Sequence, residues 1–251
     1  MAPWSVFEFH MVGYRRTWRG SALSSFVLPL LTVLGFGVAV GAHVAGGVQG
    51  VPYLDWIVPG LVASTAMQTA IGVSTWPVLS RFEWMKTYSA LAASPLRLAD
   101  IVAGDFLYLL FRVLVSAGAF LIVAAAFGAV HSWWTPAALA VCALVGFAVG
   151  GPTTAYSAAV RSDSYLAILL RFAVLPMSLF SGVFFEVGAL PAVLRWVAYA
   201  LPLWHGVELS RAAMLGIAPH WPAAAHLAVL VSWVTAGIAL TIRQFHRRLV
   251  Y

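Results

Sequence analysis

The sequence predicts an all-α integral membrane protein with six transmembrane helices. Of its 251 residues, 62% are apolar and only 9% are charged, whereas ordinary soluble domains are about 45–50% apolar and about 25% charged. Long stretches also carry no charge, between Arg19 and Asp55 and between Arg112 and Arg161, and a bilayer core needs roughly 20 apolar residues of helix. These observations exclude a soluble enzyme and a disordered chain. A disulfide scaffold is also excluded, because the chain has one cysteine, Cys142.

The spans follow from the uncharged intervals in chain order. The first interval ends in a glycine-rich turn at 43–52, and the segment HSWWTP divides the interval after Arg112 into two spans. The expected spans cover about residues 21–42, 56–80, 101–128, 137–159, 165–185 and 224–242. Signal-peptide cleavage after the first of them is not expected, because that apolar run is too long and starts too far along the chain. Residues 1–251 are therefore expected to form one transmembrane domain.

The basic residues predict the orientation of the spans. If the spans alternate in direction, ten of the fourteen basic residues fall in the N-terminal segment, the loop after span two, the end of span four and the C-terminus. Only Arg195 and Arg211 fall in the opposite loops. Because cytoplasmic loops are enriched in lysine and arginine, both termini are expected in the cytoplasm.

The segment before the first span, residues 3–19, is expected to be an interfacial amphipathic helix. Its large apolar side chains recur at helical spacing, and its arginines gather next to the span. Such a helix lies in the plane of the membrane surface, with its rings among the acyl chains and its guanidinium groups on phosphates. The alternative is a frayed leader with incidental aromatic residues.

The loop at 81–100, RFEWMKTYSALAASPLRLAD, carries five of the few charges in the chain. Its SALAASPLR stretch predicts a short helix that ends before Pro95, because the residue preceding a proline disfavours helical geometry. Charge in a charge-poor protein favours a surface offered to a soluble partner. An ordinary solvated loop is the alternative.

The segment at 186–223 lies on the outer side of the expected topology, yet it is too apolar for a solvated loop. Pro191 and Pro202 divide it into pieces of roughly 18 Å of helix, which are too short to cross a bilayer. Two short helices that dip into the membrane from outside fit best. Within them WHGVE places His205 and Glu208 on one helical face, with Arg211 one turn further on. We expect His205 and Glu208 to form a hydrogen-bonded pair, since a metal site would need further ligands.

The order of these segments resembles the type-2 ABC exporter permeases. The resemblance covers essentially the whole chain and is strongest in LAASPLRLADIVAGDF and in PLWHGVELSR. Within these permeases the chain is most similar to the branch that includes exporters of nodulation lipo-oligosaccharides and of daunorubicin-type drugs. The resemblance implies a bacterial inner-membrane protein in which two permeases, identical or paralogous, sit on two separate ABC ATPase subunits.

The resemblance also implies roles for particular residues. The loop at 81–100 and the N-terminal helix would dock on the ATPases, and spans one, two and five would line the route between two permease copies. The expected ATPase-coupling residues are Arg81, Glu83, Lys86, Ser94, Pro95 and Arg97. Residues of span five that would line a greasy substrate path are Met177, Phe180, Ser181, Phe184 and Phe185. The alternative for a helix this apolar is ordinary packing.

The source of energy follows from motifs that the sequence lacks. It has no GxxxxGK[ST] phosphate loop, so the chain itself is expected to bind no cofactor, and ATP and Mg²⁺ would be bound by the partner. Acidic residues occur only at or near span ends, which argues against a carrier driven by protons or sodium. The charge balance of +6 reports topology, and no nucleic-acid partner is expected.

Two arginines lie inside spans, Arg112 and Arg171. They either extend to the inner head groups along the bilayer or meet an anionic head group at the inner end of the path. The spans carry few hydrogen-bonding side chains, which favours an amphipathic substrate such as a lipid, a glycolipid or a hydrophobic drug. The alternatives are a polysaccharide-exporting permease of the same family, a membrane-embedded lipid-modifying enzyme, and a channel or structural subunit.

Overall fold

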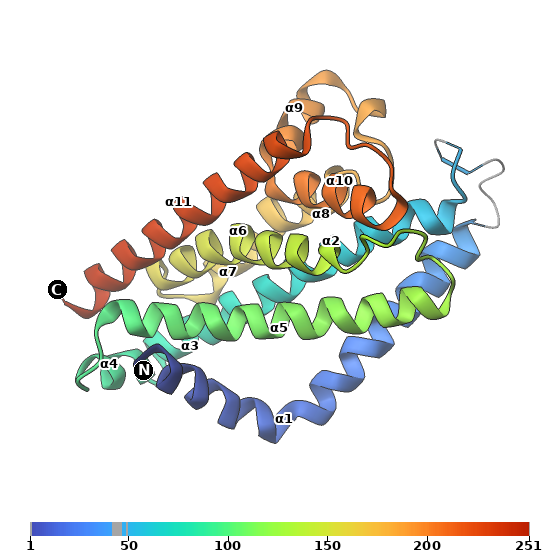
Figure 1. Cartoon of the computed structure of the whole chain (residues 1–251). Coiled ribbons are helices and arrows are strands. Elements are labelled where there is room, and N and C mark those ends of the chain that lie inside the picture. The colour runs from blue at the N-terminus through green and yellow to red at the C-terminus, as the bar shows by residue number, and fades with distance from the viewer. Residues whose placement is uncertain (1, 42–46, 49, 251) are drawn as a thin grey trace.

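The computed structural model describes residues 2–41, 47–48 and 50–250; half of the expected glycine-rich turn at 43–52, residues 43–46 and 49, lies outside them. Every regular element in these ranges is helical (Figure 1). In chain order they are α1 (Ala2–Thr32), η1 (Val33–Val40), α2 (Tyr53–Ser74), α3 (Trp76–Glu83), α4 (Thr87–Ala92), α5 (Leu98–Ala126), α6 (Ala137–Ala159), α7 (Asp163–Leu169), η3 (Leu170–Val174), α8 (Leu175–Phe180), η4 (Val187–Ala189), α9 (Ala192–Ala200), α10 (Pro202–Leu215) and α11 (Ala223–Leu249).

Five of the described segments are long and apolar enough to cross a membrane. They are Tyr53–Glu83, Leu98–Ala126, Ala137–Ala159, Asp163–Phe180 and Ala223–Leu249. The pair Pro3–Gly20 and Ser25–Gly37, bent by 50°, makes a sixth if it is counted as one span. The prediction of an all-helical membrane protein with about six spans is confirmed at this level.

Three spans differ in detail from the regular helices expected. The N-terminal segment and the first span form one bent helix, α1, since no proline separates them. The second is broken at Thr75, because Pro77 occupies the first turn of α3 and lacks a backbone N–H to continue the ladder. The fifth contains the π-helical turn η3 before Pro176, which opens α8.

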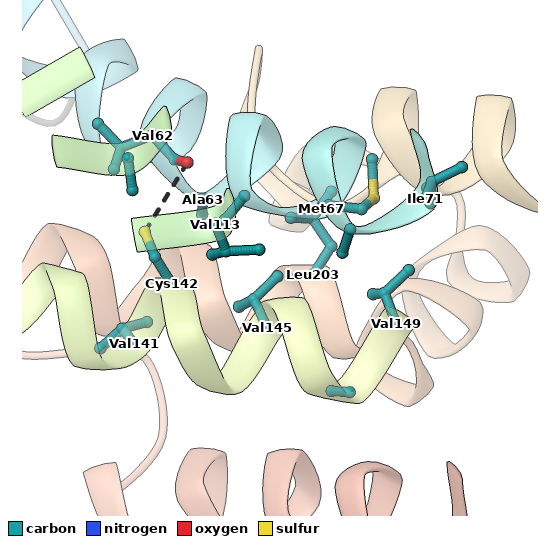
Figure 2. Packing of buried hydrophobic residues seen from close by; sticks show 14 of the residues in the cluster. Val62, Ala63, Met67, Ile71, Val113, Val141, Cys142, Val145, Val149 and Leu203 are labelled. Carbon is teal, nitrogen blue, oxygen red and sulfur yellow. Dashed lines mark hydrogen bonds between the residues drawn. The ribbon is translucent and has the colours of Figure 1, made fainter. Parts of the chain in front are cut away.

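The core of the bundle forms where α2 packs on α6, with α5 and α10 beside them. Val62, Met67, Val145 and Leu203 are among its fully buried side chains, and Figure 2 shows them interleaved between the helices. The thiol of Cys142 lies 3.8 Å from the carbonyl oxygen of Val62 on α2. Burial of this apolar surface, at about 25 cal/mol per Å², fixes α2 as the central helix.

Small residues allow the closest helix crossings. A Cβ atom added to Gly151 on α6 would lie 3.0 Å from the Cα atom of Gly237 on α11. The hydroxyl of Thr241 donates to the carbonyl of Gly151 across this crossing, at 3.0 Å. Gly146 and Gly150 face Val113 and Leu109 of α5, so this glycine face serves packing within the chain.

The two ends of the bundle differ in architecture. Both termini lie at the end that carries α4 (Figure 1), where Arg248 of α11 bonds Glu83 of α3. The short helices α9 and α10 lie at the opposite end (Figure 1).

Candidate functional site

A cavity with a partly polar lining lies between α1 and α2. This α1–α2 cavity has a volume of about 690 Å³ and is bordered by α3, α5 and η1. Its lining is formed by Ser25, Leu28, Pro29, Thr32, Phe36, Leu61, Ser64, Thr65, Gln68, Thr69, Gly72, Val73, Pro77, Arg81, Tyr108, Arg112, Ser116 and Phe184. The volume is in the range of small-molecule sites.

A stripe of neutral polar side chains from α2 faces this cavity. Ser64 and Gln68 are one helical turn apart, as are Thr65 and Thr69, because positions four apart share a helix face. Gln68 is exposed and stands midway along the 31-residue segment Tyr53–Glu83. Its amide donates to the Ser64 hydroxyl in a long bond of 3.4 Å. An amide at this depth is costly against lipid, so the stripe favours a polar molecule in the cavity.

Two arginines lie at the end of the cavity nearer α3. Arg112 is midway along the 29-residue α5, inside the span. Its guanidinium lies 5.2 Å from the ring centre of Tyr14 on α1. Arg81 also lines a second cavity of about 730 Å³ between α1 and α3. This α1–α3 cavity shares Pro77, Arg81 and Tyr108 with the α1–α2 cavity, so the two adjoin.

The span-five residues expected to line the path are placed unevenly. Phe184 lines the α1–α2 cavity and its ring centre is 5.0 Å from that of Phe36. The other span-five residues are absent from this lining: Met177 and Ser181 are buried, Phe180 is half-buried, and Arg171 and Phe185 are exposed. The structure therefore groups Arg112 and Phe184 with the α2 stripe rather than with the rest of span five.

The expected ATPase-coupling residues surround α4. Lys86 precedes this helix with φ at 53°, a left-handed conformation uncommon for residues other than glycine. The Ser94 hydroxyl donates to the carbonyl of Leu91 at 2.6 Å, which closes the end of α4. Arg97 is exposed and caps α5, its N–H donating to the Asp100 carboxylate at 3.1 Å. Pro95 is exposed next to it.

Arg81 and Glu83, by contrast, bond to other helices of the bundle. Glu83 accepts a bond from Arg248, whose guanidinium also donates to the carbonyls of Ala158 and Val160 at 2.9 and 3.1 Å. Arg81 lies 3.7 Å from the carboxylate of Asp105 on α5. These two residues hold α3 in the bundle and leave α4 as the exposed part of the segment.

At the opposite end, Arg211 joins three elements. Its guanidinium donates to the carbonyl oxygens of Gly182 and Trp56 at 2.6 and 3.3 Å and to the Glu208 carboxylate at 3.3 Å. Glu208 also accepts the backbone N–H of His220 at 2.9 Å. The bonds of this buried arginine are directed at protein oxygens. Arg211 therefore fixes α10 against α2 and against the non-helical segment that follows α8.

The expected bond between His205 and Glu208 is wrong. His205 instead faces His226 of α11, with 2.8 Å between the two Nδ1 atoms, and its Nε2 donates to the carbonyl of Tyr199 at 2.9 Å. Burial lowers the pKa of His205, against the opposing effect of the Tyr199 carbonyl and Glu208. The neutral ring then accepts the His226 proton at Nδ1. His205 therefore ties the hairpin to α11.

Sequence reasoning missed the residues that give these sites their character. Gln68, with its neighbouring serine and threonines, was the only glutamine inside a predicted span, which is the signal that could have identified the stripe. Asp105 was placed near a span end, whereas its side chain is 11% exposed and is bonded by other helices. In the described residues, no group of three or more His, Cys, Asp or Glu side chains is arranged to hold a metal ion.

The fold and these sites define a class of protein: a helical membrane subunit with a polar cavity between its helices. The sequence matches the family described as ABC-2 type transporter over residues 4–215, and the chain belongs to this family. Members of the family are membrane subunits of transporters that normally work with an ABC ATPase subunit. The resemblance to the permeases of ABC exporters is therefore confirmed.

Relatives with curated names agree over the full length of the chain. Nodulation protein J of Sinorhizobium fredii (strain NBRC 101917 / NGR234) is 29% identical, with 99% of this chain and 95% of the relative covered. Nodulation protein J of Rhizobium leguminosarum bv. trifolii is also 29% identical, with 98% and 93% covered. The protein of the same name from Bradyrhizobium diazoefficiens is 25% identical, with 98% and 93% covered.

Proposed function

We propose that this permease exports an amphipathic molecule with a neutral, hydroxyl-rich head group, such as a glycolipid. The observation that carries the proposal is the α2 stripe in the α1–α2 cavity, where Gln68 and its neighbours offer donors and acceptors without charge. A hydrophobic drug would leave these polar groups unpaired, at a cost of about 1–3 kcal/mol each. The similarity to proteins named for nodulation supports a substrate exported from the cell.

The lining of the cavities supports the amphipathic part of the proposal. The α1–α3 cavity is lined largely by aromatic and apolar side chains, among them Phe9, Trp76, Trp84 and Met85, which suit an acyl chain. The α1–α2 cavity continues from it past Arg81 and presents the polar stripe. A molecule with one apolar and one hydroxylated end would match an apolar cavity that adjoins a polar one.

The energy for export would come from a separate ABC ATPase that binds ATP and Mg²⁺. The exposed surface of α4, with Lys86, Pro95 and Arg97 around it, would dock on this subunit. Both termini lie at the same end of the bundle as α4, so they would face the cytoplasm across a bacterial inner membrane. The hairpin of α9 and α10 would then dip into the membrane from the outer side.

A second permease copy, identical or paralogous, would cover α7 and α8. This segment is apolar and long enough to span a membrane, yet only 11% of it is buried within the chain. Exposed Ile168, Phe172 and Leu175 leave it an apolar face that lipid or a partner must cover. Two permeases and two ATPases would complete the assembly.

The test compares two substrates in proteoliposomes that contain the permease and its ATPase. The probes are a fluorescent short-chain glycosylceramide and an apolar fluorescent dye, and ATP-dependent movement of each is measured. Gln68→Leu is expected to slow glycosylceramide transport about tenfold, since it removes one or two hydrogen bonds of about 1 kcal/mol each, while the dye is unaffected. Thr235→Val is the control, because Thr235 is exposed on α11, away from the cavity.

Two results would overturn the proposal. Equal effects of Gln68→Leu on both probes would show that the stripe does not select hydroxylated substrates. The absence of ATP-dependent transport of either probe by the wild-type complex would reject export itself.

A further inference from the structure

The carboxylate of Asp105 on α5 is shared by three other helices. Its Oδ1 atom lies 2.6 Å from Nε2 of His10 on α1, and its Oδ2 atom accepts the hydroxyl of Tyr88 on α4 at 2.7 Å. Arg81 of α3 lies 3.7 Å from Oδ1. The carboxylate thus contacts α1, α3 and α4, and it lies two helical turns inside α5.

Tyr88 anchors α4 in the bundle, with the half-buried Leu91 beside it. Tyr88 is the one buried residue of α4 and is 0% exposed, whereas the other residues of the helix are exposed or half-buried. Its ring is wedged between those of Phe82 and Phe245, with centres 4.5 and 4.9 Å away. Any displacement of α4 must therefore move the Tyr88 hydroxyl, and with it the bond to Asp105.

His10 makes the corresponding attachment on α1. It is 5% exposed, and its ring stacks on Tyr108 of α5 with centres 4.9 Å apart. One turn earlier, Val6 packs directly on Gly104, where a side chain on α5 would collide with it. The first half of α1 is thereby fixed to α5 at Asp105, while its second half walls the α1–α2 cavity.

We propose that Asp105 is a positioning residue that transmits the movement of α4 to α1. This inference rests on the proposed function, in which an ATPase moves α4. Hydrogen bonds to a carboxylate are short and strong in surroundings that exclude water, so the bonds that Asp105 accepts from Tyr88 and from His10 resist separation better than packing alone. The path then runs from α4 through Tyr88, Asp105 and His10 to the helix that lines the cavity.

The first test measures transport per ATP hydrolysed in proteoliposomes, with the fluorescent glycosylceramide as probe. Tyr88→Phe removes the hydroxyl and keeps the buried ring, and Asp105→Asn keeps the shape and removes the charge. Both are expected to leave ATP hydrolysis within about twofold of wild type and to lower the probe moved per ATP about tenfold, which corresponds to a lost coupling free energy of about 1.4 kcal/mol. Asp100→Asn is the control, because Asp100 lies on the same helix but caps its own N-terminus.

The second test follows the helices themselves. Spin labels at Arg15→Cys on α1 and Ala90→Cys on α4, both exposed positions, report their separation with and without nucleotide. In the wild-type complex the separation is expected to stay constant as the helices move together, and in Tyr88→Phe it is expected to change on ATP binding. If Asp105→Asn does not fold, Tyr88→Phe alone still tests whether the bond between Tyr88 and Asp105 couples α4 to α1.

An unchanged ratio of transport to hydrolysis, with unchanged label separations and only a lower melting temperature, would make Asp105 a merely structural residue. A wild-type complex that hydrolyses ATP but moves no probe would reject the proposed function. The label separations would still test the junction in that case, so the two failures are distinguishable.

Discussion

Replacement of Arg211 by methionine is expected to loosen the outer hairpin. Methionine keeps the length of the apolar stem but removes the donors to the carbonyls of Gly182 and Trp56 and to the Glu208 carboxylate. It also removes the guanidinium that lies 3.8 Å from the centre of the Trp56 ring. Helix α10 then has no polar connection through this position to α2 or to the non-helical segment that follows α8.

The magnitude follows from what the substitution leaves behind. Glu208, whose side chain is 15% exposed, would keep only the His220 N–H as a partner, and removal of one member of a buried ion pair costs about 3–5 kcal/mol. The partial exposure of Glu208 places the expected loss at the lower end, about 3 kcal/mol. For a chain of this size each kcal/mol lowers the melting temperature by about 2–4 °C, so a fall of roughly 6–12 °C is expected.

Cys142 provides the assay. It is the sole cysteine of the sequence and is 0% exposed, so a thiol-reactive fluorogenic dye reports unfolding in detergent without an added label. Arg243→Met, at an exposed position on α11, controls for the loss of an arginine. Adding Glu208→Gln to Arg211→Met should recover part of the loss, since it removes the unpaired charge. If Arg211→Met melts within 2 °C of the Arg243→Met control, the reasoning is refuted.

Three further outcomes are expected. Gly104→Ala should lower stability by about 1–3 kcal/mol through its collision with the start of α1, whereas Gly118→Ala, with open space on the same helix, should match or exceed wild type in the dye assay. Arg248→Met should destabilise by about 1 kcal/mol more than Glu83→Gln, because the arginine also donates to two carbonyls; equal losses would contradict this. Burial lowers the pKa of His205, so the unfolded state binds more protons than the folded state, and stability should decline as pH falls below about 6.5. His205→Gln should flatten this decline. A variant with the same pH profile of stability as wild type would contradict this expectation.

The helices could be predicted from the sequence because their lengths follow from averages over many residues. The fourth expected span and α6 both cover residues 137–159, since apolar composition and bounding prolines act locally. The two short helices α9 and α10 were expected for the same reason, from Pro191 and Pro202. Local chemistry alone also predicted the end of α4 before Pro95.

The contacts that give the sites their properties could not be predicted, because they depend on which helix covers which face. Asp105 looks like a residue near a span end in the sequence, and its two partners on α1 and α4 lie 95 and 17 residues away. Gln68 is one of many residues on a mostly buried helix until α1 leaves a cavity beside it. His205 likewise bonds His226, 21 residues on, rather than its neighbour on the same turn.

The distribution of packing decides which parts of the permease can move. The α2–α3 segment is 72% buried and the α7–α8 segment is 11% buried, and α6 is locked to α11 where Gly151 meets Gly237. Close-packed cores move between discrete arrangements rather than deform, so rearrangement should fall on α7–α8 and on the second half of α1, where Leu28 and Leu31 are exposed. The polar stripe then lies on the fixed wall of the cavity and α1 forms the moving wall. A small shift of α1 would change what faces Gln68 without unpacking the core, which is the property an exporter needs to release a molecule it has bound.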